Sequence, residues 1–152
     1  MTTKIKLPNI DTTYDYSSLV GSAYAQANSS ANLSMTIALS DETTSITTGT
    51  AKVTFRVPYA ITLYQIPRAS LATASTSGNP AIDINKNGAS IFSTTLTIDA
   101  NEKTSVTAAT PAVLSTTTFA DDDEISMDVD TAGTGAKGLK VTLYYRRTWP
   151  IL

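Results

Sequence analysis

Carboxylate and amide side chains are the main groups of this chain that could bind a metal ion or take part in catalysis, because it contains no histidine and no cysteine. Asp83, Asn85, Asn87 and Gly88 match the first half of a calcium-binding loop, D-x-N-x-N-G. The twelfth position of such a loop supplies a bidentate glutamate, but here it is Thr94, and the flanking residues alternate as strands do. The pattern therefore favours a β-hairpin over a calcium site.

A denser group of carboxylates runs from Asp121 to Glu124, and Asp128 and Asp130 follow closely. Carboxylate oxygens are the ligands that divalent cations such as Ca²⁺ prefer, so this segment is where a metal ion would bind if the protein holds one. The other interpretation is a solvated loop whose charges discourage edge-to-edge pairing of strands. We favour the solvated loop.

Asp99 and Glu102 form a carboxylate pair of the type that glycosidases use, but residues 99–103 have the composition of a turn. The lack of histidine removes the commonest general base and transition-metal ligand, and the lack of cysteine removes thiolate catalysis and disulfides. No nucleophile elbow, phosphate-binding loop or nucleotide fingerprint is present. We therefore expect a protein that is not an enzyme, has no catalytic residues and binds no metal or other cofactor.

The C-terminal segment 144–152 is the most suggestive surface feature of the sequence. Arginine, tyrosine and tryptophan are the residue types that supply most binding energy at protein interfaces, and an apolar chain end needs cover. The alternative interpretation is that this tail packs back on its own domain. We expect contacts with another subunit or another protein through side chains near both ends of the chain: Tyr14, Tyr16, Tyr24, Tyr144, Arg146, Arg147, Trp149, Ile151 and Leu152.

The elements that must position these groups are strands, and the stretch Ile82–Phe92 specifies its own structure most completely. Asn87-Gly88 is the dipeptide that a two-residue type I′ turn favours, because both central positions need positive φ. Pairing outward from this turn places Lys86 opposite Ala89, Asn85 opposite Ser90 and Ile84 opposite Ile91. The turn therefore predicts both a hairpin and its register.

Alternation of apolar and polar residues predicts the other strands. It is clearest over 33–39 and 51–57, where Pro58 ends the strand. Further strands are expected over 60–71 with an edge or bulge at Pro67, through Leu96 and Ile98 as a continuation of the hairpin, weakly at Val106 and 112–114, and over 125–130 and 139–145. No crossover helix is expected between residues 32 and 145. Roughly eight strands without helices predict an all-β fold, an antiparallel β-sandwich of the jelly-roll type.

Composition and charge limit the domains and partners. We expect an N-terminal extended arm over 1–31, one sandwich domain over 32–145, and a C-terminal tail over 146–152. The alternative for residues 1–31 is a disordered terminus. Residues 17–27 contain good helix formers, but no apolar stripe supports a helix there. The net charge of −2 and the pI near 4.9 give no reason to expect nucleic-acid binding. No apolar run approaches the length of a membrane span, so we expect no membrane partner and no secretion signal.

The chain resembles a β-sandwich domain that recurs in virion structural proteins of tailed bacteriophages. The resemblance covers about residues 33–143, and the residues that support it lie in seven stretches: Thr48–Ala60, Pro67–Leu71, Ile82–Gly88, Ser93–Asp99, Glu102–Ser105, the acidic loop at 121–124, and Gly138–Leu143. It implies a non-enzymatic virion component. The arm before Asn32 and the end after Leu143 depart from the recurring domain, and we expect the individual role of this chain to lie there.

Two functions are compatible with that resemblance. The first is a capsid decoration (cement) protein on the outer surface of the virion, a homotrimer that contacts the major capsid protein through its arm and its Trp149-containing tail. The second is a tail or head fibre knob that binds a host-surface receptor or glycan. We favour decoration, because the first 31 residues are too short to form a shaft. Under both hypotheses, truncation before Arg146 is expected to leave the domain folded and to weaken attachment.

Overall fold

The computed structural model describes residues 4–5, 14–15 and 31–148. The chain divides into two compact units, residues 1–31 with 151–152, and residues 32–150. In the first unit, β1 (Lys4–Ile5) pairs antiparallel with β2 (Tyr14–Asp15). The helix considered over 17–27 lies outside the described residues. The second unit contains all the other strands, β3 to β14.

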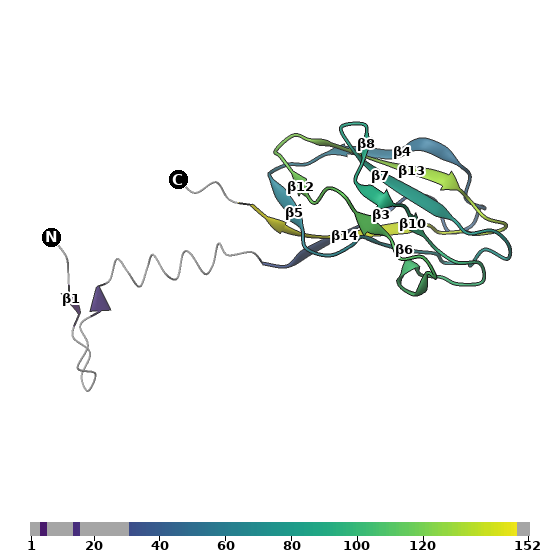
Figure 1. The fold of residues 1–152 in the computed structure, drawn as a ribbon, viewed down its shortest axis with the longest axis horizontal. Helices are drawn as coiled ribbons and strands as arrows, with labels where there is room; N and C mark the ends of the chain where they lie inside the picture. Colours follow the sequence, from purple (N-terminus) through teal and green to yellow (C-terminus); the bar gives the residue numbers. More distant parts are fainter. Residues whose placement is uncertain (1–3, 6–13, 16–30, 149–152) are drawn as a thin grey trace. The chain divides into compact units, whose positions relative to one another are not determined.

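Two five-stranded antiparallel sheets build the second unit as facing layers (Figure 1). The first, which we call the β14 sheet, has the order β12 (Thr118–Phe119), β5 (Ile61–Leu63), β14 (Lys140–Arg147) and β3 (Leu33–Ala38), with β6 (Arg68–Ser70) also paired to β14. The second, the β13 sheet, has the order β10 (Leu96–Thr97), β7 (Ala81–Lys86), β13 (Glu124–Thr131) and β4 (Gly49–Arg56), with β8 (Ala89–Ser90) paired to β7. A separate two-stranded sheet joins β9 (Phe92–Thr94) to β11 (Val113–Leu114).

This architecture confirms the predicted all-β, antiparallel β-sandwich. In the described part of the chain the only helix is η1 (Ser105–Thr107), a single 3₁₀ turn. No helix among these residues is long and apolar enough to cross a membrane. The jelly-roll connectivity stays a prediction.

The core lies between the two sheets, and strand alternation explains which residues enter it. On β14 the residues Val141, Leu143 and Tyr145 are buried, while their neighbours are partly or fully exposed. The same period buries the apolar residues of β7 and β13: Ile82, Ile84, Ile125, Met127 and Val129. Both central sheets thus contribute one apolar face to a shared core.

The central hairpin has the predicted turn and register. Asn87 and Gly88 have φ of 50° and 82°, as a type I′ turn requires. Asn85 pairs with Ser90 and Lys86 with Ala89, and the Ile91 amide donates to the Ile84 carbonyl at 2.9 Å. The Asn87-Gly88 dipeptide was therefore sufficient to predict this part of the fold.

Four predicted elements differ from the structure. The expected strand over 60–71 is two strands, β5 and β6, which pair with the two ends of the same edge of β14. Pro67, which has no amide donor, lies between them and is fully buried. The hairpin's second strand does not continue unbroken, because β8 and β10 pair with β7 whereas β9, between them, pairs with β11.

The strand predicted at Val106 was wrong. Val106 lies in η1, where its amide donates to Thr104 Oγ1 at the N-cap, and its side chain is 59% exposed. The last strand is also longer than predicted. β14 includes Arg146 and Arg147, which pair with Thr62 and Ile61 of β5, so these arginines belong to the sheet rather than to a tail.

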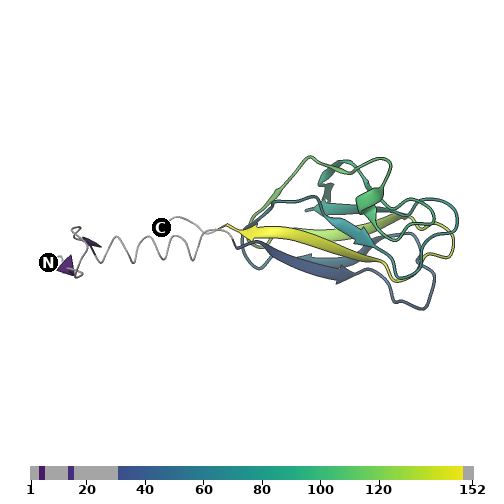
Figure 2. The same ribbon diagram turned by 90° about the horizontal axis from the view of Figure 1, so that it is seen from below.

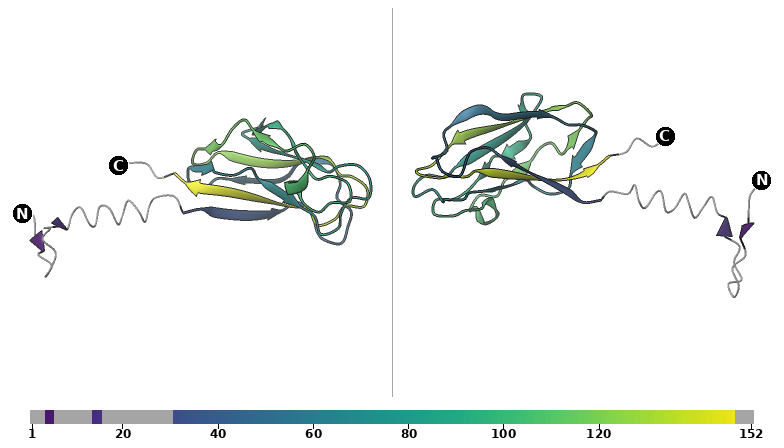
Figure 3. Two further views of the ribbon diagram at one scale, coloured as in Figure 1. Left: turned by 60° about the horizontal axis from the view of Figure 1, so that its bottom comes forward. Right: turned by 180° about the vertical axis from the view of Figure 1, so that it is seen from behind.

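β14 is the organising strand of its sheet. It pairs with β3 along six consecutive residues on one side and with β5 and β6 on the other. Figures 2 and 3 show β14, in yellow, beside β3 on one face of the sandwich. The outward side chains of β14 therefore project from the middle of an exposed sheet face.

Candidate interaction surface

The outward face of β14 presents Tyr144 and Arg146, because their neighbours Leu143 and Tyr145 point into the core. Arg68 on β6 joins the same face, since it pairs with the outward residue Thr142. Tyr64 follows β5, and its amide donates to the Tyr144 carbonyl at 3.2 Å. Three segments that are distant in sequence thus bring two tyrosines and two arginines together.

These four side chains form a continuous stack, which we call the Tyr–Arg row: Arg68, Tyr144, Tyr64 and Arg146. The Arg68 guanidinium carbon lies 5.3 Å from the centroid of the Tyr144 ring. The two rings meet edge to face with centroids 6.4 Å apart. The Arg146 guanidinium carbon lies 5.1 Å from the Tyr64 centroid. Each cation–π contact at such a site stabilises by about 0.5–1 kcal/mol, so the row holds its long side chains in defined positions.

The two arginines of the row have no carboxylate partner among the described residues. The four ion pairs in that part of the chain use Arg56, Lys86 and Lys140 instead. Arg146 has one neutral partner, because its Nε donates to Asn32 Oδ1 at 2.9 Å. The row therefore offers positive charge and ring surface on a protein whose net charge is −2.

A further cation–π contact anchors the end of β14. The Arg147 guanidinium carbon lies 4.3 Å from the centroid of the Tyr59 ring. Burial raises the pKa of the Tyr145 hydroxyl, and a hydrogen bond with Tyr59 adds to this shift. These contacts tie the last residues of β14 to the segment between β4 and β5.

An open groove of about 440 Å³ adjoins the row. Tyr64 and Arg68 of the row line it, together with Ile66, Val106 and Pro111. Ile66 is 43% exposed, so the groove presents apolar surface to solvent. The Ser105 hydroxyl accepts a hydrogen bond from the Ala69 amide at 2.9 Å, which holds η1 against β6 and fixes the groove's shape.

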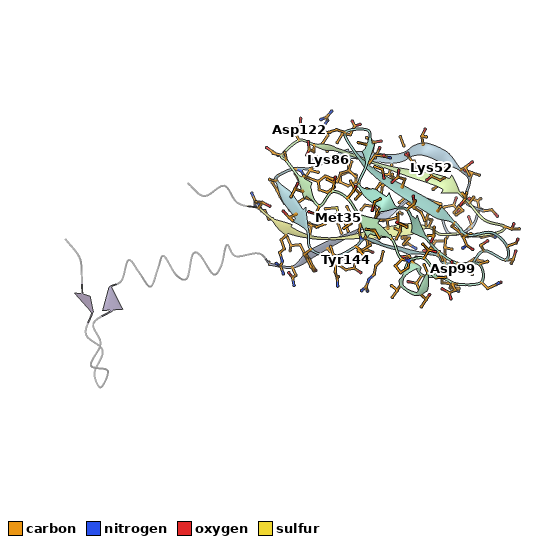
Figure 4. The ribbon with its side chains drawn as sticks, in the orientation of Figure 1. Met35, Lys52, Lys86, Asp99, Asp122 and Tyr144 are labelled. Carbon is orange, nitrogen blue, oxygen red and sulfur yellow. The ribbon has the colours of Figure 1, made fainter. Side chains whose placement is uncertain are left out.

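The acidic run has local partners, as a structured loop would. Asp122 and Glu124 pair with Arg56 at 3.4 and 3.7 Å, and Asp123 pairs with Lys86 at 3.1 Å. Figure 4 shows Lys86 and Asp122 on the side of the sandwich opposite Tyr144. Three of the carboxylates considered for a cation, Asp122, Asp123 and Glu124, therefore face basic side chains.

Asp123 is the most fully bonded carboxylate of the run. Its two oxygens accept hydrogen bonds from Asn87 Nδ2 at 2.7 Å and from the Ala120 amide at 2.6 Å. These two bonds, followed by Lys86, hold the pKa of Asp123 below its usual range. Asp123 thus connects the acidic loop to the turn of the central hairpin.

The residues that match half of a calcium loop belong to the hairpin. Asp83 accepts from the Ile84 amide and the Ser90 hydroxyl, at 2.8 and 2.6 Å. Asn85 donates to Asp128 Oδ2 at 3.0 Å. Burial, with the nearby charges of Asp83 and Asp128, raises the pKa of Asp130. No group of three or more carboxylates in the described ranges is arranged to hold a metal ion.

Asp99 and Glu102, considered as a glycosidase pair, act as loop anchors. Asp99 accepts hydrogen bonds from Asn79 Nδ2 and from the Ala109 amide, both at 2.8 Å. Glu102 accepts from the Thr107 hydroxyl. Their oxygens hold the loops between β10 and β11, and residues 99–101 form the turn that the sequence predicted.

Only part of this surface could be identified from the sequence. Of the predicted contact residues, Tyr144, Arg146 and Arg147 lie on β14, and Tyr14 lies in β2. The others lie outside the described residues: Tyr16, Tyr24, Trp149, Ile151 and Leu152. Tyr64 and Arg68 were missed. The inward phase of Ile61 and Leu63 already implied an outward Tyr64, but its pairing with β14 required the long-range register.

Comparison with known proteins adds no relatives. No family model, no curated protein and no solved structure matches this chain. The Tyr–Arg row and its groove are therefore interpreted from their own chemistry.

Proposed function

We propose that this chain is a non-enzymatic bacteriophage virion structural protein, a capsid decoration protein that attaches to the outer capsid surface through the Tyr–Arg row. The observation that supports attachment is the row itself, in which Arg68 and Arg146 have no carboxylate partner among the described residues. The sequence resemblance to virion proteins is the basis for proposing that the partner assembly is a tailed-phage particle.

The chemistry of the row suits a large protein partner. Tyrosine and arginine are enriched among the residues that dominate interface energies. Guanidinium groups already stacked on rings lose little freedom on binding, and each can form a bidentate pair with a carboxylate. We infer that the partner, the major capsid protein under this proposal, presents acidic and apolar groups to the row.

Immunogold labelling of purified particles with an antibody against the recombinant chain tests the location. Uniform label over the head supports decoration. Label on the tail or fibres, or no label on any particle, contradicts it. The second test asks how the chain attaches, by rebinding recombinant protein to heads from which it has been removed.

Arg146→Ala is expected to weaken rebinding at least tenfold, because it removes one charged contact of the interface. Arg56→Ala is the matched control, since this arginine is exposed and lies in the β13 sheet. Equal rebinding of Arg146→Ala and wild type would show that the row is not the attachment surface. The circular dichroism spectrum of each variant establishes that it is folded.

A second candidate is a fibre knob that binds a host-surface receptor or glycan, and the groove beside the row favours it. The groove combines the polar groups of Arg68 and Tyr64 with exposed apolar walls, which is the usual character of a ligand site. Under this function, Val106→Arg would abolish adsorption to host cells while leaving attachment to the particle intact. Decoration predicts that this variant adsorbs normally.

A further inference from the structure

The four edges of the two large sheets are not equally protected against pairing with another strand. β10 and β12 are only two residues long. β4 carries Lys52 and Arg56, and its pairing with β13 is interrupted by a register shift near Ala51, which has φ of 49°. Short strands, charges and bulges are the devices that block edge-to-edge association. Three edges therefore have such a device.

β3 has none of these devices. It pairs with β14 without a register shift over six residues, and its sequence, LSMTIA, contains no charge and no proline. No strand of the described residues pairs with its outer edge. Leu33 is 37% exposed, and Met35 and Ile37 are only partly buried although they point toward the core. This edge is a regular template for one more strand.

The hydrogen bonds of β14 show which groups β3 presents outward. The Leu39 amide donates to the Leu139 carbonyl, and the Tyr144 carbonyl accepts from Tyr64 on the opposite side of β14. Because donors alternate along an antiparallel pair, the amides and carbonyls of Ser34, Thr36 and Ala38 point away from β14. An added strand must meet these three residues.

We propose that β3 binds β3 of a second copy of this chain as an antiparallel, two-fold pair with Thr36 opposite Thr36. In this register Ser34 lies opposite Ala38, so the outward amides and carbonyls of each copy meet those of the other. Met35 lies opposite Ile37, which keeps the apolar residues of both copies on the core side of one continuous sheet. The partly exposed apolar residues of β3, Leu33, Met35 and Ile37, are then covered by the same residues of the second copy.

Charge complementarity selects a second copy in the antiparallel direction. Asn32, which holds Arg146, would lie opposite Ser40 of the other copy, directly before Asp41 and Glu42. Both acidic residues are exposed, and Glu42 pairs with Lys140 of its own copy, which leaves Asp41 as the excess negative charge at this end. Arg146 has no carboxylate partner among the described residues. The two-fold pair therefore brings each basic end of the edge to the acidic end of its partner, whereas a parallel pair would bring like charges together.

Analytical ultracentrifugation of the full chain tests the proposal. The wild type is expected to show a monomer–dimer equilibrium. Thr36→Lys and Thr36→Glu should each weaken dimerisation at least tenfold, because two like charges then meet at the two-fold axis. An equimolar mixture of these two variants should recover the dimer, since opposite charges meet there. Thr54→Lys, the same change at an exposed residue of β4, is the matched control and should behave as wild type.

Several results would overturn the proposal. A wild-type chain that sediments as a monomer at about 0.5 mM has no such contact. A dimer or trimer that Thr36→Lys does not change assembles through another surface. Loss of the dimer without recovery in the mixture means that the strand bound to β3 belongs to a different segment or protein.

Thr36→Pro decides the same question if the charged variants do not fold. Proline removes only an outward amide at this position, so the pairing with β14 is kept while the contact between copies is lost. Thr36→Ala controls for the hydroxyl, which bonds to the Thr142 hydroxyl at 2.9 Å. Dimerisation of Thr36→Pro as strong as that of Thr36→Ala would overturn the proposal.

Discussion

Gly133 and Gly88 have the same backbone conformation but different surroundings. Both have positive φ, 66° and 82°. A Cβ at Gly133 would overlap Ser75 Oγ and lie 2.8 Å from the Gly78 carbonyl oxygen, whereas no described residue other than its chain neighbours lies within 4 Å of a Cβ at Gly88. Ser75 is fully buried and holds this junction by accepting from the Thr134 amide. Space, as well as φ, therefore requires glycine at Gly133.

We expect Gly88→Ala to lower the free energy of unfolding by about 1–2 kcal/mol, the cost of a left-handed backbone for alanine. Gly133→Ala should lower it by more, about 3 kcal/mol or greater, because the buried Ser75 bonds must also break. Urea unfolding of the two variants measures the difference. Equal losses would show that the junction around Ser75 adapts at little cost.

Asp123 makes the stability of the hairpin end depend on pH. Its pKa is lower in the folded protein than in the unfolded chain, so its contribution is fully present above about pH 4 and is lost as pH falls through the folded value. The gap in unfolding free energy between wild type and Asp123→Asn should therefore shrink between pH 6 and about pH 2. Urea titrations at a series of pH values test this, with Asp121→Asn as the control for loss of an exposed charge in the same run. A constant gap for Asp123→Asn would contradict the prediction.

At the scale of the strand, β14 places a core residue directly beside a residue of the proposed attachment surface. Leu143 is buried in the core, and its neighbour Tyr144 belongs to the exposed row. We expect Leu143→Ala to lower the free energy of unfolding by about 2–5 kcal/mol. Tyr144→Ala should lower it by about 1–2 kcal/mol, the worth of one ring pair and one cation–π contact, and should impair rebinding to heads more strongly than any stability loss explains. Unfolding and rebinding measured on both variants test the separation, and a row without a binding role would leave Tyr144→Ala fully competent to rebind.

The strands differ in how far the sequence could predict them. The hairpin at Asn87-Gly88 was predicted with its register, because a turn of two residues leaves no freedom in the pairing. Alternation predicted β3, β4, β13 and most of β14, because each has one face on the core. It failed at Val106, since a single exposed apolar residue has no period, and it did not predict that β5 and β6 share one edge of β14.

The whole molecule depends on contacts that local sequence does not encode. Thr36 bonds to Thr142, 106 residues away, and the Tyr–Arg row joins β14 to residues nearly 80 positions earlier in the chain. No turn specifies these registers, because many residues separate the strands. Tyr144 and Arg146 were therefore predicted as contact residues from their type alone, and Tyr64 and Arg68 could be added only once the sheet was assembled.

The extent of β14 changes the truncation expected from the sequence. Arg146 and Arg147 pair with β5, and the Thr148 amide donates to the Ala60 carbonyl at 2.8 Å. A chain that ends before Arg146 should therefore be less stable by about 2 kcal/mol or more than one that ends after Thr148. Comparison of the two truncations by urea unfolding tests this. Equal stability of the two truncated chains would show that residues 146–148 do not stabilise the sheet and act as a tail.

Leu33, at the start of β3, pairs with Tyr145 near the end of β14. The chain therefore enters and leaves the sandwich at the same end of the β3–β14 ladder. Tension applied through the two chain ends would open this ladder one pair at a time, from Leu33–Tyr145 toward Ala38–Lys140, instead of loading all its hydrogen bonds at once. Such a zipper yields at low force, while β14 stays held on its other side by β5 and β6. A particle that strains this protein through its ends would therefore peel β3 first and leave most of the core intact.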